Sequence, residues 1–359
     1  MLKTGIFVII FITLFSFLFY FKGDKVQKIN VISPNSRLTV TPSKSLVQQD
    51  LKRSIFVPYW TLKNDLDMDG FDEVFYFGIT ANMQGIDKDD QGYKAIDRFI
   101  GKVEINKKKL LVVRLTNSKI NSEILDNTKL QQKIINDSIE IAKKNKFDGI
   151  VLDFEISSLY FDSVVKNINN FSKYFYESSK IQNLMFYLTI YGDNFYRLRP
   201  YDISFLAKNS DKLMIMVYDF HKARGNPGPN FPYTGKEVYG YDFKTMINDF
   251  LKKIPAQKVT IIFGLFGYDW PIDDKGQSIK SGIPISENEI DNKFIKKCIY
   301  KNCNLEKSKD SLEPRISYID EDSKPHVIWF ESLESINKKI EYLKSSNINS
   351  VSYWAYSYF

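Results

Sequence analysis

The sequence predicts a (β/α)₈ barrel, because eight short apolar runs alternate with amphipathic segments between residues 54 and 354. The runs are rich in β-branched and aromatic residues and nearly continuous in apolar residues, which is typical of parallel strands covered on both faces. They lie at 54–60, 73–79, 109–115, 149–154, 184–190, 212–218, 258–265 and 350–354. Helices are predicted between them, most clearly at 130–145, 241–254 and 332–346.

An open, doubly wound sheet is the alternative fold for such an alternation. That fold usually carries a glycine-rich turn after its first strand. Residues 58–65 read PYWTLKND and contain no glycine. The barrel is therefore the favoured prediction.

The first predicted element is a membrane anchor at residues 1–22. Its uncharged run at 5–21 has seventeen residues, which is the lower limit for crossing a bilayer. No small-residue cleavage pattern follows, so an anchor is favoured over a cleaved signal peptide, with a buried core helix as the third alternative. We expect a barrel held outside the cytoplasm, or a secreted protein if the segment is cleaved. The polar stretch 23–52 is expected to be a linker.

The barrel is expected to span 53–359, with one interruption at about 271–328. This polar stretch lies between the seventh strand and the last helix, and we interpret it as a small α+β insertion beside the cleft. It contains both cysteines, Cys298 and Cys303. In an oxidising compartment a local disulfide is plausible, and a pair of free thiols is the alternative.

The composition excludes several classes of protein. With 43% hydrophobic and 26% charged residues, the chain is neither disordered nor fibrous. Its only two histidines, His221 and His326, exclude a multi-histidine zinc centre, and two cysteines exclude a Cys₄ metal site. A net charge of +7 is small for 359 residues, so nucleic acid is not an expected partner, although an anionic wall or membrane is compatible. We expect a monomer without a cofactor.

Carboxyl groups gather at the end of the fourth predicted strand, where residues 147–155 read FDGIVLDFE. Alternation along a strand directs Val151, Asp153 and Glu155 into the barrel and the intervening apolar residues toward the helices. Barrel active sites form at this end of the strands. Two close carboxyl groups resist ionising together, which raises one pKa and suits a general acid. An acidic helix N-cap is the structural alternative.

FDGIVLDFE resembles the strand-four signature DGxDxDxE of family 18 glycoside hydrolases. Further matches follow in the family's order. MVYDFH at 216–221 resembles the strand-six motif Met-x-Tyr-Asp, and GLFGYDW at 264–270 resembles a segment of the bacterial spore and peptidoglycan-lytic branch. Residues 326–354 resemble the end of that branch. The resemblance implies a barrel that hydrolyses β-1,4-linked N-acetylglucosamine polymers, in chitin or peptidoglycan.

The resemblance also implies roles for the matching residues. Glu155 would protonate the leaving glycosidic oxygen and then act as a base toward water, while the acetamido oxygen of the substrate attacks the anomeric carbon. Asp153 would hold the acetamido N–H and stabilise the oxazolinium ion, and Tyr218 would bind the acetamido oxygen. The sugar-binding residues would be Met216, Asp219, Tyr268 and Trp354. Without the motif, Tyr218 is equally compatible with a buried structural tyrosine. For Trp354 a core aromatic is the alternative, which its place at a strand end disfavours.

Three positions depart from the family pattern. Val151 replaces the first Asp of the signature, so we expect Asp153 to lack an inward partner, to turn toward Glu155 and to shift the pH profile. The third strand reads VVRLTN at 112–117, where chitinases carry Ser-x-Gly-Gly. The sequence leaves two alternatives for Arg114, which either points into the barrel or packs outside it. Phe266 replaces a tyrosine that is common in the branch.

Two other functions are compatible with the sequence. A non-catalytic carbohydrate-binding relative normally lacks the acid, which is present here as Glu155. A membrane-tethered structural protein would explain the apolar run at 5–21 but not the retained polar residues of the motifs.

Overall fold

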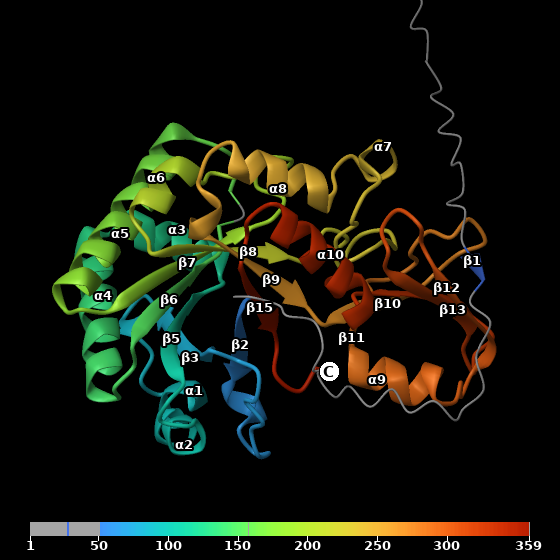
Figure 1. Ribbon diagram of the computed structural model, residues 1–359, viewed down its shortest axis with the longest axis horizontal. Coiled ribbons are helices and arrows are strands. Elements are labelled where there is room, and N and C mark those ends of the chain that lie inside the picture. Colours follow the sequence, from blue (N-terminus) through green and yellow to red (C-terminus); the bar gives the residue numbers. More distant parts are fainter. Residues whose placement is uncertain (1–26, 29–50, 157, 359) are drawn as a thin grey trace, which may run out of the picture.

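The computed structural model describes residues 27–28, 51–156 and 158–358 (Figure 1). The predicted anchor at 1–22 and most of the predicted linker lie outside these residues. Within the described ranges, no helix combines the length and the apolar character that a membrane span requires.

Eight parallel strands form a closed barrel, which confirms the predicted (β/α)₈ fold (Figure 1). Pairing of the last strand with the first, and of the first with the second, closes the ring. The strands are β2 (Lys52–Pro58), β3 (Glu73–Asn82), β5 (Lys108–Leu115), β6 (Gly149–Phe154), β7 (Met185–Tyr191), β8 (Lys212–Val217), β9 (Val259–Gly264) and β15 (Ser350–Trp354). A short β4 (Gly85–Ile86) pairs with the end of β3.

Helices surround the barrel and cover its outer face (Figure 1). They are α1 (Gln91–Lys94), α2 (Ile96–Lys102), α3 (Ser118–Leu125), α4 (Thr128–Lys144), α5 (Asp162–Ile181), α6 (Ile203–Lys208), α8 (Phe243–Leu251) and α10 (Leu333–Ser345). A further short helix, α7 (Lys236–Tyr239), contains no buried residue. Side-chain caps fix where several begin: Asn127 accepts from an amide of α4, and Asp242 from one of α8. The helices predicted at 130–145, 241–254 and 332–346 correspond to α4, α8 and α10.

The alternation of side chains along the strands produces two apolar cores. Val151 of β6 packs in the cluster inside the barrel, together with residues such as Phe75 and Met214. Its neighbours Leu152 and Phe154 pack in the larger cluster between strands and helices. The predicted orientation of strand four is therefore confirmed, and it directs Asp153 and Glu155 to the open end of the barrel.

Between β9 and α10 the chain builds a second, antiparallel sheet, which we call the lobe (residues 266–330; Figure 1). Its strands are β10 (Phe266–Pro271), β11 (Ile283–Ser286), β12 (Lys301–Lys307), β13 (Pro314–Ile319) and β14 (Pro325–Phe330), and β1 (Gln27–Lys28) pairs with β12. A short helix α9 (Glu287–Ile290) and a π-helical turn (Asp291–Ile295) pack against the sheet. The structure joins Cys298 and Cys303 in a disulfide.

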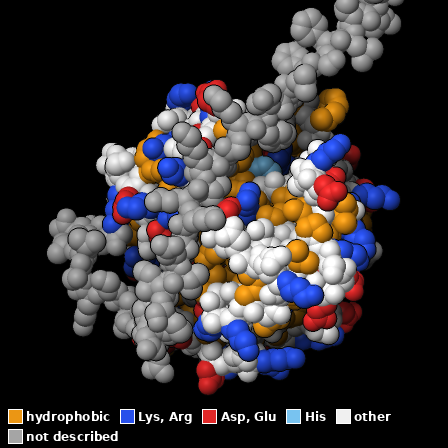
Figure 2. Space-filling model, turned by 90° about the vertical axis from the view of Figure 1, so that its right-hand side faces the viewer, with side chains coloured by type: hydrophobic (Ala, Val, Ile, Leu, Met, Phe, Trp, Pro, Cys, Tyr) orange, Lys and Arg blue, Asp and Glu red, His pale blue; other side chains and the backbone are white. Residues whose placement is uncertain are grey.

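The lobe side of the molecule is shown in Figure 2. On the described part of this face, basic and acidic side chains are interspersed among hydrophobic and uncharged ones. A basic stripe of the kind that binds nucleic acid is not present on that visible surface.

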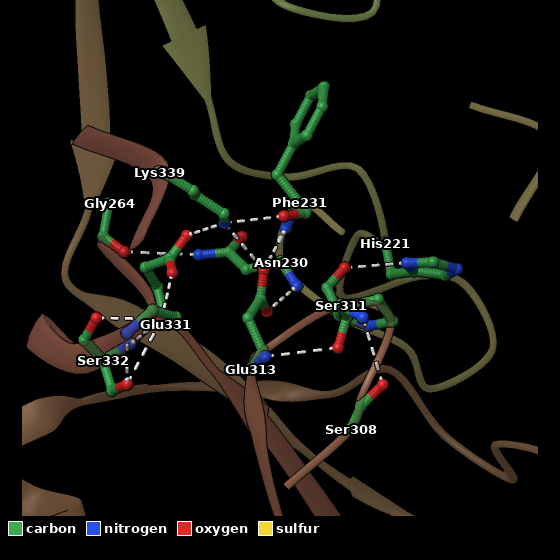
Figure 3. Close-up of polar contacts among 12 residues, drawn as sticks. His221, Asn230, Phe231, Gly264, Ser308, Ser311, Glu313, Glu331, Ser332 and Lys339 are labelled. Carbon is green, nitrogen blue, oxygen red and sulfur yellow. Dashed lines mark hydrogen bonds and ion pairs between the residues drawn. The ribbon is translucent and has the colours of Figure 1, made fainter. Parts of the chain in front are cut away.

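A buried ionic cluster joins the lobe to the barrel (Figure 3). The ammonium group of Lys339 in α10 contacts the carboxylates of Glu313 and Glu331, and it donates to the carbonyl oxygen of Phe231 at 2.7 Å. All three charged side chains are fully buried. Burial raises the pKa of both glutamates, to about 8 for Glu313, while the charge of Lys339 opposes this rise.

Candidate active site

A cleft of about 560 Å³ opens at the C-terminal ends of the barrel strands and is walled on one side by the lobe. Its lining includes six of the residues predicted for the site: Asp153, Glu155, Tyr218, Asp219, Tyr268 and Trp354. Met216 does not line the cleft, because it packs in the apolar cluster inside the barrel. The structure therefore brings both carboxyl groups and the aromatic residues to one cavity.

Glu155 follows β6 and is fixed through both its backbone and its side chain. Its N–H donates to the carbonyl oxygen of Leu115 at 2.9 Å, and its own carbonyl oxygen accepts a hydrogen bond of 2.7 Å from the side-chain amide of Asn121. Its carboxylate accepts a hydrogen bond of 2.7 Å from the hydroxyl of Tyr191. Burial raises the pKa of Glu155, although the Tyr191 bond and the charge of Lys222 oppose the rise. A carboxyl group that keeps its proton longer is suited to general acid catalysis.

Asp153 is only 6% exposed, and its carboxylate accepts a hydrogen bond of 2.7 Å from the hydroxyl of Thr189. Burial and the charge of Glu155 raise the pKa of Asp153 to about 7, while Thr189 and Arg114 oppose the rise. The expectation that Asp153 lacks a partner was wrong. Its partner comes from the neighbouring strand: Leu152 of β6 pairs in register with Leu188 of β7, so the next residues, Asp153 and Thr189, lie side by side.

Asp219 lies directly after Tyr218 at the end of β8 and adopts a left-handed backbone conformation, with φ at 58°. Its N–H donates to the side-chain oxygen of Asn230 at 2.8 Å. Its carboxylate accepts a hydrogen bond of 2.7 Å from the hydroxyl of Tyr268 in β10. Asp219 thus connects the barrel to the lobe at the edge of the cleft.

Aromatic rings form the remaining wall of the cleft. The ring of Trp354 lies 4.4 Å from that of Phe77 and 5.6 Å from that of Phe56, in edge-on contacts. Trp60 also lines the cleft and is 43% exposed. Flat apolar faces of this kind suit the apolar face of a sugar ring.

The two other departures noted in the sequence are also placed by the structure. Arg114 pairs in register with Asp153 and so lies on the inward face; it forms an ion pair of 3.0 Å with Asp90 and lies 4.9 Å above the ring of Phe77. Phe266 lines the cleft and packs edge-on against Tyr218 at 5.8 Å.

The sequence reasoning missed Thr189 and Tyr191, which donate hydrogen bonds to the carboxylates of Asp153 and Glu155. A usable signal was present, since the alternation applied to strand four also directs Tyr187, Thr189 and Tyr191 of the fifth strand inward. The lobe residue Glu289, which lines the cleft, carried no such signal. Among the described residues, no group of three or more His, Cys, Asp or Glu could hold a metal ion.

Comparison with known sequences gives one family and several curated relatives. The family described as "Glycosyl hydrolases family 18" matches residues 44–358. The "Uncharacterized glycosylase YvbX" of Bacillus subtilis is 26% identical over 238 residues, which cover 65% of this chain and 64% of the relative. The "Cortical fragment-lytic enzyme" of the same organism is 21% identical over 256 residues, or 68% of this chain and 56% of the relative. The matched region is thus less than two thirds of either relative.

Solved structures share the fold at low sequence identity. The spore cortex-lytic enzyme SleL of Bacillus cereus has a TM-score of 0.67 at 19% identity, over 86% of this chain and 71% of its own. A class V chitinase of Nicotiana tobaccum, solved in complex with NAG4, has a TM-score of 0.73 at 14% identity, over 87% of this chain and 95% of its own. At such identities the similarity concerns the fold alone.

Proposed function

Because the chain belongs to family 18 of the glycosyl hydrolases, we propose that this glycosidase hydrolyses β-1,4-linked N-acetylglucosamine polysaccharides with retention of configuration. The observation that carries the proposal is a pair of carboxyl groups, the buried Asp153 and the partly buried Glu155, both with raised pKa, in a cleft walled by aromatic rings. A carboxyl group that is still protonated near neutral pH can deliver a proton to a leaving oxygen.

In the proposed reaction Glu155 protonates the glycosidic oxygen and the substrate's own acetamido oxygen attacks the anomeric carbon, which makes a protein nucleophile unnecessary. Asp153 accepts a hydrogen bond from the acetamido N–H and stabilises the positive charge that develops on the newly formed ring. Tyr218 binds the acetamido oxygen, Asp219 shapes the pocket, and Tyr268 orients Asp219. Met216 acts only from beneath, because it packs in the apolar cluster inside the barrel. Trp354 supports the apolar face of the sugar. Water then opens the intermediate, with Glu155 acting as the base.

Substrate assistance can be tested with the polymer itself. We expect chitooligosaccharides to be cleaved and fully deacetylated glucosamine oligomers to resist, because the latter lack the attacking acetamido oxygen. A thiazoline analogue of the cyclic intermediate should inhibit, since the site is complementary to the charged species. Products are identified by mass spectrometry. Efficient cleavage of the deacetylated oligomers would refute the proposed nucleophile.

The same assay distinguishes the two polymers and the non-catalytic alternative. Relatives are named as a cortical fragment-lytic enzyme and as a chitinase, so peptidoglycan and chitin are both candidates for this chain. Incubation of the protein with each polymer shows which one releases soluble fragments. Binding of both without any product would support a carbohydrate-binding protein instead.

The hydrogen bond from Thr189 predicts a measurable pH effect. Its hydroxyl stabilises the ionised form of Asp153. Thr189→Val should therefore raise the pKa of Asp153 from its value of about 7. If the reaction needs Asp153 ionised, activity is lost as the pH falls through this pKa, and the acidic limb of kcat/KM moves to higher pH. Thr189→Ser keeps the donor and should retain the wild-type profile. Identical profiles for the Val and Ser variants would contradict this role.

We also propose that the uncharged run at 5–21 holds the protein on a membrane, with the barrel outside the cytoplasm. Seventeen helical residues at about 1.5 Å each are slightly shorter than a hydrocarbon core of about 30 Å, and the flanking lysines can reach the interface. The full-length protein should sediment with membranes and resist extraction by carbonate. A mature form that begins after residue 21 would identify a cleaved signal instead.

A further inference from the structure

A buried chain of contacts connects the ionic cluster at the base of the lobe to Asp219 in the cleft. Figure 3 shows this chain from Lys339 and Glu313 to Asn230. It begins at Glu313, whose carboxylate accepts from two consecutive backbone amides, those of Asn230 and Phe231. The same carboxylate contacts the ammonium group of Lys339 at 3.3 Å. Both carboxylate oxygens of Glu313 therefore accept hydrogen bonds, and these bonds fix the backbone of the loop at 230–231.

Asn230 connects this fixed loop to the ends of the barrel strands. It is 2% exposed, and each polar atom of its side chain is bonded. Its amide nitrogen donates to the carbonyl oxygens of Gly264 at 3.3 Å and Phe266 at 3.1 Å, and its oxygen accepts the N–H of Asp219 at 2.8 Å. Its backbone carbonyl oxygen accepts the N–H of Phe220 at 2.8 Å. One side chain thus joins the ends of β8, β9 and the start of β10.

Asp219, whose N–H donates to Asn230, has a left-handed backbone conformation. Asp219 has a φ of 58°, a region that costs free energy for a residue with a Cβ, although less for Asp than for most residues, and that neighbouring hydrogen bonds can stabilise. The hydrogen bonds that the N–H groups of Asp219 and Phe220 donate to Asn230 stabilise this conformation. The carboxylate of Asp219 then meets the hydroxyl of Tyr268 at 2.7 Å, and both side chains line the cleft.

We propose that Glu313 and Asn230 are positioning residues of this glycosidase, which hold Asp219 in its left-handed conformation and so aim its carboxylate at Tyr268. Neither residue lines the cleft, and neither contacts the reacting groups. Their effect on the reaction passes through Asp219. The kinetic part of this proposal rests on the proposed function, whereas its structural part does not.

Two isosteric substitutions in the same cluster test the proposal. Glu313→Gln and Glu331→Gln each remove one buried carboxyl group and leave the other to pair with Lys339. At position 331 the new amide can still donate to the hydroxyl oxygen of Ser335 and accept from Lys339. Glutamine at position 313 has only one oxygen for the two backbone N–H groups of Asn230 and Phe231, so its NH₂ group must face one of these two donors. Only Glu313→Gln should therefore displace Asn230.

The expected kinetic result is a fall in kcat for Glu313→Gln of roughly tenfold to 100-fold, because a misplacement of about 1 Å in an active site can cost about 10² in rate. KM for chitooligosaccharides should change much less. Glu331→Gln should stay close to the wild type in both parameters when each is measured well below the melting temperature of the variants. Equal losses in the two variants would show a structural role only and overturn the proposal.

Amide hydrogen exchange at Asp219 provides a readout that needs no activity. Its N–H should exchange faster in Glu313→Gln than in the wild type and in Glu331→Gln. If the wild type cleaves no N-acetylglucosamine polymer, the proposed function fails and exchange still decides the positioning role. If Glu313→Gln does not fold, Asn230→Ala removes the acceptor of the Asp219 N–H but keeps the backbone amides bound to Glu313, and it should show the same faster exchange. Unchanged exchange at Asp219 in both variants would refute the proposal.

Discussion

Replacing Glu155 with glutamine should abolish glycoside hydrolysis while the fold and sugar binding persist. Glutamine has nearly the same size, and its oxygen can still accept the hydrogen bond from Tyr191. It cannot deliver a proton to the leaving oxygen, and general acid catalysis contributes about 10²–10⁴-fold to the rate. The measurement is the turnover of chitooligosaccharides, together with the affinity of the inactive variant for the same ligand.

A matched control lies at the opposite end of the barrel. Glu73, at the start of β3, is also a partly buried carboxyl group with a raised pKa, and it accepts a hydrogen bond from Tyr187 at 3.1 Å. Glu73→Gln should leave turnover near the wild-type level, because active sites of barrels lie at the other ends of the strands. Wild-type turnover in Glu155→Gln, or an equal loss in Glu73→Gln, would sink the assignment of the acid.

The barrel and the direction of the proposed catalytic side chains could be predicted from sequence because both follow from local patterns. Nearly continuous apolar runs mark strands that are buried on both faces. The period of two along FDGIVLDFE is enough to place Asp153 and Glu155 inward once the segment is recognised as a strand.

The hydrogen-bond partners of these carboxylates are harder to predict, because they depend on the register between strands. Thr189 reaches Asp153 only because β6 and β7 pair with Leu152 opposite Leu188. A register shifted by one residue would turn Thr189 to the other face. The same limit explains why Val151 suggested an unpartnered Asp153: the replacement partner is 36 residues away in sequence.

The lobe and its junction with the barrel depend on contacts that are still more distant in sequence. Its strands pair antiparallel across long connections, as where Gly267 of β10 meets Phe330 of β14. A lysine in the helix predicted at 332–346 is expected to face solvent, as most lysines do, and this applies to Lys339. It is fully buried because Glu313 and Glu331 surround its charge, which no local pattern indicates.

The second large effect is expected for the stability of Lys339→Met. Loss of the ammonium group leaves two buried carboxyl groups without a counter-charge, and breaking a buried ion pair in this way typically costs about 3–5 kcal/mol. Lys338→Met is a matched control one residue away in α10. Lys338 is exposed and pairs with the exposed Glu341, so its loss should change the free energy of unfolding by less than about 0.5 kcal/mol.

The cost of Lys339→Met should also depend on pH, with a sign that follows from the raised pKa values. Burial already holds the pKa of Glu313 and Glu331 above 4.5, and removal of Lys339 raises both further. Between pH 4.5 and those folded-state values the native protein binds more protons than the unfolded chain, so its stability falls as the pH rises. The wild type loses stability in the same way only up to its own, lower folded-state pKa values, so the difference between the two proteins grows above those values. Urea unfolding should therefore show a larger difference from the wild type at pH 9 than at pH 5. A difference that is independent of pH, or one no larger than that of Lys338→Met, would show that the cluster is not held as a buried ion pair.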